Sequence, residues 1–272
     1  MKKILFIIDK IELKYFEFNN LVTNFWMIKE FLENGNEVFI TTIPNLSLKQ
    51  DKAYTKCFET FVDNNNIFYK DSKIEKEIDS FDLVLFRPDP PVDIDYINAT
   101  YIFDFVSKPK VVNSPSAIRD FNEKLHSVHF KELMTDNIVT ASLEEIEAFL
   151  AIHKQIVLKP LNRCFGSGVM YLYEGDPNTR TIINTMTNNE TTLVMVQEFI
   201  PAVKKGDKRV LTLGDRVLKY CIKKLPTKDD FKFNTHNDNF ITSAELTDEE
   251  FDSFTRVAQK LNSMGICMAG LD

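Results

Sequence analysis

The sequence predicts an α/β protein with two domains, the first of which contains a parallel sheet. The first 120 residues alternate strand-like and helix-like segments, as layered α/β folds do. Beyond residue 120 the order of segments changes. The chain of 272 residues is 44% hydrophobic, so a sizeable core is expected. Length alone allows one large domain or two to three small ones.

In the first domain, four apolar runs predict buried strands, and they are Ile4–Ile8, Val38–Ile43, Leu83–Phe86 and Val111–Val112. Apolar residues at helical spacing from Leu21 to Leu32 predict an amphipathic helix with Gly35 at its C-terminal cap. A second helical stretch is expected near Tyr96–Val106. Residues 46–80 are polar and remain unassigned.

In the second domain, the expected strands are Ile156–Leu158, Val169–Tyr173, Leu193–Glu198, 209–213, 217–225 and Ile266–Leu271. A helix is expected over Glu123–Leu133. Two capping-box patterns predict further helix starts, one at Ser142 and one at Thr247, each with a glutamate three residues later. Gly265 lies near the end of the last helix. Residues 226–240 are rich in Asp, Asn and Lys and are expected to form a loop.

Composition excludes several classes of function. The net charge is −7 without a long run of one sign, which argues against a general nucleic-acid binder. The four cysteines lack CxxC spacing, so neither a disulfide framework nor a zinc site is expected, and a cytoplasmic location follows. Ile4–Ile8 is too short for a signal peptide or a membrane span. Only 8 residues are glycine, so glycine-rich loops must be few.

Ten separated motifs, in order along nearly the whole chain, resemble bacterial glutathione synthetase, a family of ATP-grasp ligases. In the first half they are Arg87-Pro88-Asp89-Pro90-Pro91, Ala99-Thr100-Tyr101-Ile102, Val112-Asn113-Ser114-Pro115, Arg119-Asp120 and Asn122-Glu123-Lys124-Leu125. In the second half they are Leu158-Lys159-Pro160, Glu174-Gly175-Asp176-Pro177-Asn178, Gln197-Glu198-Phe199-Ile200-Pro201-Ala202, Lys205-Gly206-Asp207-Lys208-Arg209-Val210-Leu211 and Gly270-Leu271-Asp272. Each motif alone is weak, whereas the collinear set is specific.

The resemblance implies a ligase that joins γ-glutamylcysteine to glycine and converts ATP to ADP and phosphate through an acyl phosphate. It implies ATP and Mg²⁺ (or Mn²⁺) as cofactors, a homo-oligomer, and no nucleic-acid or membrane partner. Phosphoryl transfer requires charge neutralisation around the phosphates, which explains the lysines and arginines in the motifs. Residues 1–120 are expected to bind substrate. Residues 121–272 are expected to form the ATP-grasp domain, with an ATP-binding subdomain at about 121–200 and a second at about 201–272.

The resemblance also implies roles for individual residues. Lys124 and Lys159 match the lysines that contact the ATP phosphates, and Asp272 matches the first acidic metal ligand. Arg209 and Lys224 are the expected catalytic residues. The other expected nucleotide-binding residues are Gly166, Gly168, Gln197, Glu198, Phe199, Ile200 and Asp207. The expected substrate-binding residues are Arg87, Asp89, Tyr101, Ser114 and Lys232. Arg87 has the alternative of pairing with Asp89 or Asp93 in a turn.

Four departures from the family pattern limit the transfer of function. The phosphate loop at Leu161–Gly168 keeps two glycines but is bulkier. Lys224 stands where the family has arginine, so bidentate geometry is lost. Thr227–Asn239 replaces a glycine-rich lid. The family continues past Gly-Leu-Asp with a Glu and an Asn that bind metal, so we expect a fragment or a natural truncation. Two alternatives stay open: a ligase for another acid and amine, or a non-catalytic nucleotide-binding module.

Overall fold

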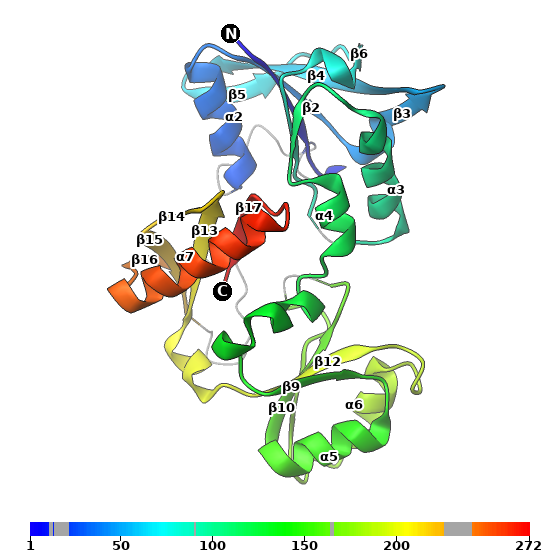
Figure 1. The fold of residues 1–272 in the computed structure, drawn as a ribbon, viewed down its shortest axis with the longest axis vertical. Helices are drawn as coiled ribbons and strands as arrows, with labels where there is room; N and C mark the ends of the chain where they lie inside the picture. Colours follow the sequence, from blue (N-terminus) through cyan, green and yellow to red (C-terminus); the bar gives the residue numbers. More distant parts are fainter. Residues whose placement is uncertain (11–12, 14–21, 90, 164–165, 226–240) are drawn as a thin grey trace. The chain divides into compact units, whose positions relative to one another are not determined.

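The computed structural model describes residues 1–10, 13, 22–89, 91–163, 166–225 and 241–272. The chain forms two compact units (Figure 1). Unit 1 comprises Met1–Arg119 with Gly265–Cys267, and unit 2 comprises Asp120–Met264 with Met268–Asp272.

Unit 1 is built on an eight-stranded sheet with the order β3-β4-β2-β1-β7-β8, in which β5 and β6 also pair with β4. The strands are β1 (Lys3–Ile7), β2 (Glu37–Thr41), β3 (Leu46–Lys49), β4 (Lys52–Asp63), β5 (Asn66–Tyr69), β6 (Ile74–Glu77), β7 (Leu83–Phe86) and β8 (Lys110–Val112). Strands β2, β1, β7 and β8 run parallel, as predicted. Strand β4 is antiparallel to β2, so the sheet is mixed.

Helices cover both faces of the parallel part. The helical segments of this region are α2 (Thr23–Glu33), η2 (Ile43–Asn45), η3 (Ile78–Ser80), α3 (Ile94–Ile102), η4 (Phe103–Phe105) and α4 (Pro115–Asp120). Phe31 of α2 packs against Phe6 of β1, with ring centroids 6.1 Å apart. Tyr96 of α3 belongs to the core that contains Leu5 and Ile7. Because neighbouring side chains of a strand point to opposite faces, α2 and α3 lie on opposite sides of β1.

The four strands β3 to β6 occupy the region that sequence patterns left unassigned. The inward positions of β4 include Ala53, Thr55 and Cys57, which are buried but only weakly apolar. The Thr55 hydroxyl donates to Thr41 Oγ1 at 2.9 Å, so its burial is compensated by a hydrogen bond. A strand whose buried face carries Ala, Thr and Cys gives little hydrophobic periodicity, which explains the missed assignment.

The first part of unit 2 is a four-stranded antiparallel sheet with the order β11-β10-β12-β9. Its strands are β9 (Asn137–Thr140), β10 (Gln155–Pro160), β11 (Met170–Tyr173) and β12 (Val194–Glu198). Helices α5 (Leu143–His153) and α6 (Thr179–Met186) pack on one face, where Ile156 and Leu158 of β10 enter the core. By strand alternation, Lys159 points to the other face.

The second part of unit 2 is a five-stranded antiparallel sheet with the order β14-β13-β15-β16, and β17 pairs with β13. Its strands are β13 (Asp207–Leu213), β14 (Arg216–Val217), β15 (Tyr220–Lys224), β16 (Ile241–Glu245) and β17 (Met268–Leu271). Helix α7 (Asp248–Ser263) contributes Phe251 and Phe254 to a core with Val210 and Cys221. The shorter segments η5 (Leu125–Leu133) and η6 (Pro201–Lys205) complete the unit.

Three local predictions for unit 2 have different outcomes. The capping box at Thr247 is confirmed, because the Thr247 and Glu250 side chains bond reciprocally to backbone N–H groups. Ser142 caps α5, but the Glu145 carboxylate accepts a hydrogen bond from the Thr140 hydroxyl, so the reciprocal half is not formed. The helix expected over Glu123–Leu133 is present from Leu125, although it is not an α-helix. That segment is a 3₁₀ helix from Leu125, and its non-helical dihedral angles at Phe130 interrupt it.

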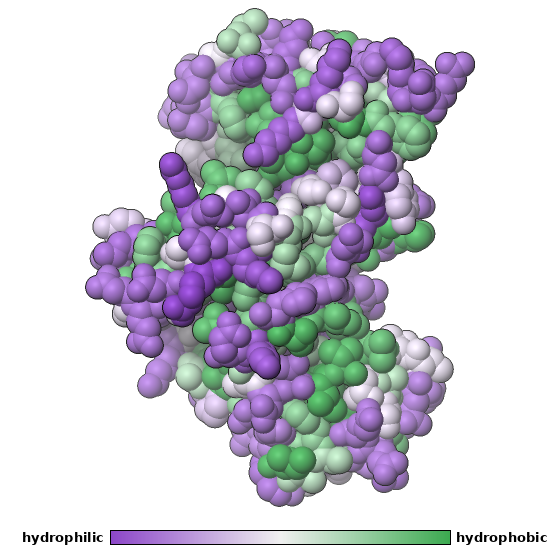
Figure 2. Space-filling model, in the orientation of Figure 1, coloured by the Kyte–Doolittle hydropathy of each residue, from purple (hydrophilic) through white to green (hydrophobic). Residues whose placement is uncertain are grey.

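The surface is mixed in polarity. Figure 2 shows hydrophilic and apolar residues interspersed over the face in view. Exposed large apolar residues include Ile94, Ile152 and Tyr220. Within the described residues, every helix is too short or too polar to cross a membrane.

Candidate active site

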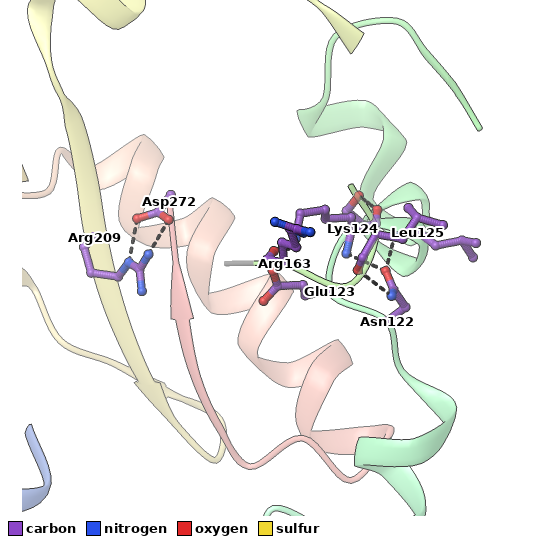
Figure 3. Close-up of polar contacts among 9 residues, drawn as sticks. Asn122, Glu123, Lys124, Leu125, Arg163, Arg209 and Asp272 are labelled. Atoms are coloured by element: carbon purple, nitrogen blue, oxygen red, sulfur yellow. Dashed lines mark hydrogen bonds and ion pairs between the residues drawn. The ribbon is translucent and has the colours of Figure 1, made fainter. Parts of the chain in front are cut away.

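Asn122 fixes Lys124 beside the loop that follows β10 (Figure 3). The Asn122 Oδ1 accepts a hydrogen bond from the Lys124 backbone N–H at 3.0 Å, and its Nδ2 donates to the Leu161 carbonyl at 2.9 Å. The Lys124 ammonium donates to the carbonyl of Arg163 at 2.5 Å and pairs with Glu123 at 2.7 Å. These contacts hold one positive charge at the mouth of the loop.

Lys159 lies at the end of β10, on the face away from the α5–α6 core. Its Nζ donates to Gln197 Oε1 at 2.7 Å across the pair of strands β10 and β12. Burial lowers the pKa of Lys159, the positive charge of Lys124 lowers it further, and the carboxylate of Asp272 acts in the opposite direction. Two cations that repel each other in a half-buried place favour the binding of a polyanion.

The loop after β10 depends on its two glycines. Gly166 and Gly168 have φ angles of +68° and +72°, a region that residues with a side chain rarely adopt. A Cβ atom on Gly168 would lie 3.0 Å from Pro160 Cγ, so the proline ring would have to shift to admit it. The two glycines thus let the backbone turn tightly beside Pro160, the residue after Lys159, and glycine turns of this kind can bind anions.

Arg209 and Asp272 form a bidentate ion pair between neighbouring strands (Figure 3). The Arg209 Nε and Nη2 donate to the two carboxylate oxygens of Asp272 at 2.6 and 2.5 Å. The pairing of β13 with β17, in which Val210 lies opposite Leu271, brings these residues together. Burial disfavours the charged guanidinium, but the hydrogen bond and charge of Asp272 outweigh it and raise the pKa of Arg209.

Lys224 joins a second carboxylate to this pair. Its ammonium lies 3.2 Å from Asp272 Oδ1 and 3.5 Å from Asp207 Oδ2. Burial raises the pKa of Asp207, and Asp272 raises it further, whereas Lys224 and Arg209 lower it. The Asp207 Oδ1 is buried and has no hydrogen-bond partner among the described residues. An unpaired buried acceptor has a free-energy cost that a bound cation or donor would remove.

The end of β12 and the two residues that follow it contain four of the expected nucleotide-binding residues, Gln197, Glu198, Phe199 and Ile200. The Glu198 N–H donates to the Asp136 carbonyl at 2.9 Å, and the Phe199 N–H donates to the Gln155 carbonyl at 3.0 Å. The Phe199 ring packs edge-on against Tyr171 with centroids 4.8 Å apart. Ile200 is exposed.

Comparison with known proteins identifies the family to which this fold and these residues belong. Residues 123–272 match the family model of the prokaryotic glutathione synthetase ATP-grasp domain, and residues 2–119 match that of the N-terminal domain of the same enzymes. The chain belongs to the prokaryotic glutathione synthetase family. It is a ligase of the glutathione synthetase type, that is, an ATP-dependent carboxylate–amine ligase, and such enzymes use ATP and a divalent metal.

Curated relatives and solved structures agree with this membership. The glutathione synthetase of Vibrio parahaemolyticus is 34% identical over 254 residues, which cover 92% of this chain and 80% of the relative. The glutathione synthetase of Neisseria meningitidis serogroup A is 32% identical over 258 residues, which cover 92% of this chain and 81% of that relative. A D-cycloserine synthetase structure has a TM-score of 0.66 at 12% identity, covering 98% of this chain and 83% of that one. The structure of an ATP-grasp ligase of Chryseobacterium gregarium has a TM-score of 0.61 at 16% identity, and the match covers 99% of this chain and 84% of that one. The structures show a shared fold.

The carboxylates of the second sheet fit a divalent metal that arrives with nucleotide. Within the described residues no group of three or more His, Cys, Asp or Glu side chains could hold a metal. Mg²⁺, however, commonly binds through one or two carboxylates together with phosphate oxygens and water. Asp272 supplies a carboxylate at this place, and the unpaired Asp207 Oδ1 lies nearby in the same ion-pair cluster.

In unit 1, Arg87 and Asp89 lie together at the carboxyl end of β7. The Arg87 Nε donates to Asn24 Oδ1 at 3.1 Å, which differs from the pairing with Asp93 considered above. Asp93 instead caps α3 by accepting from the Tyr96 N–H at 2.9 Å. The Asp89 N–H donates to Asp9 Oδ2 at 2.7 Å. Asp9 was missed by sequence reasoning, although its position directly after a buried strand was the available signal.

The other predicted substrate residues have different neighbours. Tyr101 is exposed, and the Arg119 guanidinium lies 4.7 Å from its ring centroid. The Ser114 hydroxyl is 3.0 Å from that of Ser116. Lys232 lies outside the described residues. Gln197, an expected nucleotide-binding residue, accepts a hydrogen bond from Lys159 through its side chain.

Proposed function

We propose that this ligase joins γ-glutamylcysteine to glycine with conversion of ATP to ADP and phosphate. The observation that supports this most strongly is the arrangement of charge in unit 2. Lys124 repels Lys159, while Asp272 stabilises the Lys159 charge and is itself held by Arg209. Positive groups gathered around one carboxylate suit a triphosphate and a metal that share one site.

In this proposal, Lys124 and Lys159 neutralise the phosphates, and the backbone at Gly166 and Gly168 approaches them. The base lies by the end of β12, where Glu198, Phe199 and Ile200 supply backbone groups and one wall. Gln197 acts indirectly, because its side chain orients the Lys159 ammonium.

Asp272 and Asp207 would hold Mg²⁺ or Mn²⁺, and a bound metal would supply charge that disperses the negative charge of the transferring phosphate. Arg209 and Lys224 pair with these carboxylates, Arg209 with Asp272 and Lys224 with both. Lys224 in place of an arginine suits this arrangement, because a compact ammonium can bridge two carboxylates from one point.

The reaction has two steps. A carboxylate oxygen of the dipeptide attacks the γ-phosphorus of ATP, the bond to the bridging oxygen breaks, and ADP leaves. The glycine amine then attacks the acyl carbon, the amine loses its proton, and phosphate leaves with the substrate oxygen. In this proposal Arg209 stabilises negative charge in both steps, while Lys124 and Lys159 hold the phosphates.

Residues 1–120 form the acid-substrate domain in this proposal, with Arg87, Asp89, Tyr101, Ser114 and Lys232 as its binding residues. Residues 121–272 form the ATP-grasp domain. The substrates are small molecules, and we place the enzyme in the cytoplasm, where glutathione is made from soluble precursors.

We also propose a homo-oligomer. Val210 and Cys221 face the α7 core, so neighbouring positions of the same strands face the other way, and there Leu213, Tyr220 and Ile222 are exposed. Sedimentation would detect an oligomer that a Leu213→Glu substitution dissociates. A monomer in the unsubstituted protein would refute this proposal.

The acyl-phosphate step is tested by isotope transfer. The dipeptide is labelled with ¹⁸O in its reacting carboxylate and incubated with ATP, Mg²⁺ and glycine. One labelled oxygen per turnover is expected in the released phosphate, measured by mass spectrometry together with glutathione. Glutathione formed without label in the phosphate would exclude the acyl phosphate.

A further inference from the structure

The carboxyl ends of β1 and β7 form a topological switch point in unit 1. From β1 the chain continues through α2 to β2, on one side in the sheet, and from β7 it continues through α3 to β8, on the other side. The two strands are adjacent and parallel. In open α/β sheets, ligands bind in the crevice outside the carboxyl ends of strands at such a point.

Three charged side chains lie at this point. Asp9 follows β1, and Arg87 and Asp89 follow β7. The Asp9 carboxylate accepts the Asp89 N–H at 2.7 Å, which places the two acids on adjacent strand ends. The Arg87 Nε donates to Asn24 in the first turn of α2 at 3.1 Å, so the guanidinium is held at the start of that helix.

Burial disfavours the ionised form of both acids. Burial raises the pKa of Asp9, and the Asp89 N–H lowers it. Burial also raises the pKa of Asp89, the charge of Asp9 raises it further, and Arg87 acts against both. Burial raises the pKa of Tyr96 to about 12, so this phenol supplies no charge near neutral pH. A cationic group bound between the acids would relieve their repulsion.

A γ-glutamyl peptide carries the matching charges. Its reacting carboxylate is at the cysteine end, while the glutamyl end keeps a free α-ammonium and a free α-carboxylate on one carbon. Two carboxylates beside a guanidinium complement such a zwitterion. The bond between Asp9 and the Asp89 backbone also orders this arrangement before ligand arrives.

We propose that Asp9 and Asp89 bind the α-ammonium of the γ-glutamyl group and that Arg87 binds its α-carboxylate. This inference rests on the proposed function, because it assigns a binding place to the acid substrate. It adds Asp9 as a residue that selects substrates with a free α-amino group.

The test compares two ligands by calorimetry in the presence of a non-hydrolysable ATP analogue. One is γ-glutamylcysteine, and the other is glutarylcysteine, which lacks only the α-amino group. Hydrogen bonds to charged groups contribute about 1.5–3 kcal/mol, so the unsubstituted protein is expected to bind the amino ligand about 10- to 100-fold more tightly. In Asp9→Asn this preference is expected to fall to about threefold or less, with unchanged affinity for the ATP analogue.

Asp82→Asn is the matched control. Asp82 precedes β7 at its opposite end, where it accepts from the Lys3 N–H at 2.8 Å, so the substitution removes the same charge away from the switch point. It should keep the preference for the amino ligand. Equal binding of the two ligands by the unsubstituted protein, no binding of either, or an undiminished preference in Asp9→Asn would overturn the inference. Calorimetry requires no turnover, so it tests ligand binding separately from ligation. Selective binding of γ-glutamylcysteine by a protein that forms no glutathione would overturn the proposed function and not this inference.

Discussion

At the scale of single residues, the charge of Lys159 is held where burial and Lys124 both disfavour it. A bound anion beside the Lys159 ammonium would stabilise its charge. Lys159→Ala is therefore expected to weaken ATP binding about 10- to 100-fold, because one charge-assisted hydrogen bond is lost. Calorimetry with ATP and Mg²⁺ measures the change.

Lys154→Ala is the control for that substitution. Lys154 caps the end of α5, just before β10, and pairs with Glu174 in an exposed place. Its removal deletes the same charge from the same subdomain and should change ATP affinity by less than about twofold, since exposed ion pairs contribute little. Equal losses in the two variants would show that Lys159 acts only through the net charge.

The lowered pKa of Lys159 also predicts how ATP affinity depends on pH. Only the protonated ammonium attracts phosphate, and bound phosphate favours protonation. Affinity is therefore full below the pKa of the free enzyme and falls as pH rises through it, at a pH below the ordinary lysine value of 10.5. In Lys159→Arg the guanidinium stays charged, so this decline should disappear. A decline that persists in the arginine variant belongs to another group.

At the scale of elements, the loop after β10 tests whether close packing of its backbone matters. Gly168→Ala places a methyl group 3.0 Å from Pro160 at a positive φ. Gly175→Ala also forces a side chain into a positive φ, but no atom lies within 4 Å of its added Cβ. Both variants should lose about 1 kcal/mol of unfolding free energy through strain. Only Gly168→Ala is expected to lose about 1–2 kcal/mol more and to weaken ATP binding.

Urea unfolding and ATP calorimetry of the two glycine variants give this comparison directly. The two variants could instead lose the same unfolding free energy and keep the same ATP affinity. That result would show that Pro160 shifts to accommodate the methyl group and that its contact does not require glycine at position 168.

Elements were predictable from sequence where buried residues are large and apolar. Strand β7 was predicted with its observed bounds, because Leu83–Phe86 is a continuous apolar run. Strand β4 was missed because small and polar side chains such as Ala53 and Thr55 occupy its buried face. The segment from Leu125 contains helix-forming residues, yet it forms 3₁₀ turns. Sequence pattern indicates helical character but not which hydrogen-bond register the tertiary contacts select.

Motif order proposes the residues of the candidate site but does not give their pairings. Motif order indicated Lys159, Arg209 and Asp272. The bonds of Lys159 to Gln197 and of Arg209 to Asp272 depend on the register of strands far apart in sequence, which local patterns do not set. The position of Asp9 beside Asp89 has the same origin, since it arises from the pairing of β1 with β7.

At the scale of the whole molecule, the two units have separate cores. Unit 1 is organised around Leu5 and Ile7, whereas unit 2 has one core around Ile146 and another around Val210. The proposal assigns acid substrate to the first unit and nucleotide to the second. Ligand binding stabilises the part of a protein that it contacts.

Hydrogen exchange should therefore separate the two ligands. A non-hydrolysable ATP analogue is expected to slow exchange in β10, in the loop that follows it and at the end of β12. γ-Glutamylcysteine is expected to slow exchange at the carboxyl ends of β1 and β7. Protection of unit 1 by the nucleotide analogue alone, with none in unit 2, would contradict the assignment.

The central claim is that the chain is a glutathione synthetase-type ligase, and release of ADP tests it most directly. Purified protein is supplied with ATP, Mg²⁺, γ-glutamylcysteine and glycine, and each component is omitted in turn. The account predicts that ADP release beyond one equivalent per enzyme requires all four and yields one glutathione per ADP. ADP release that continues without glycine or the dipeptide, or that another amine or acid supports better, would contradict it.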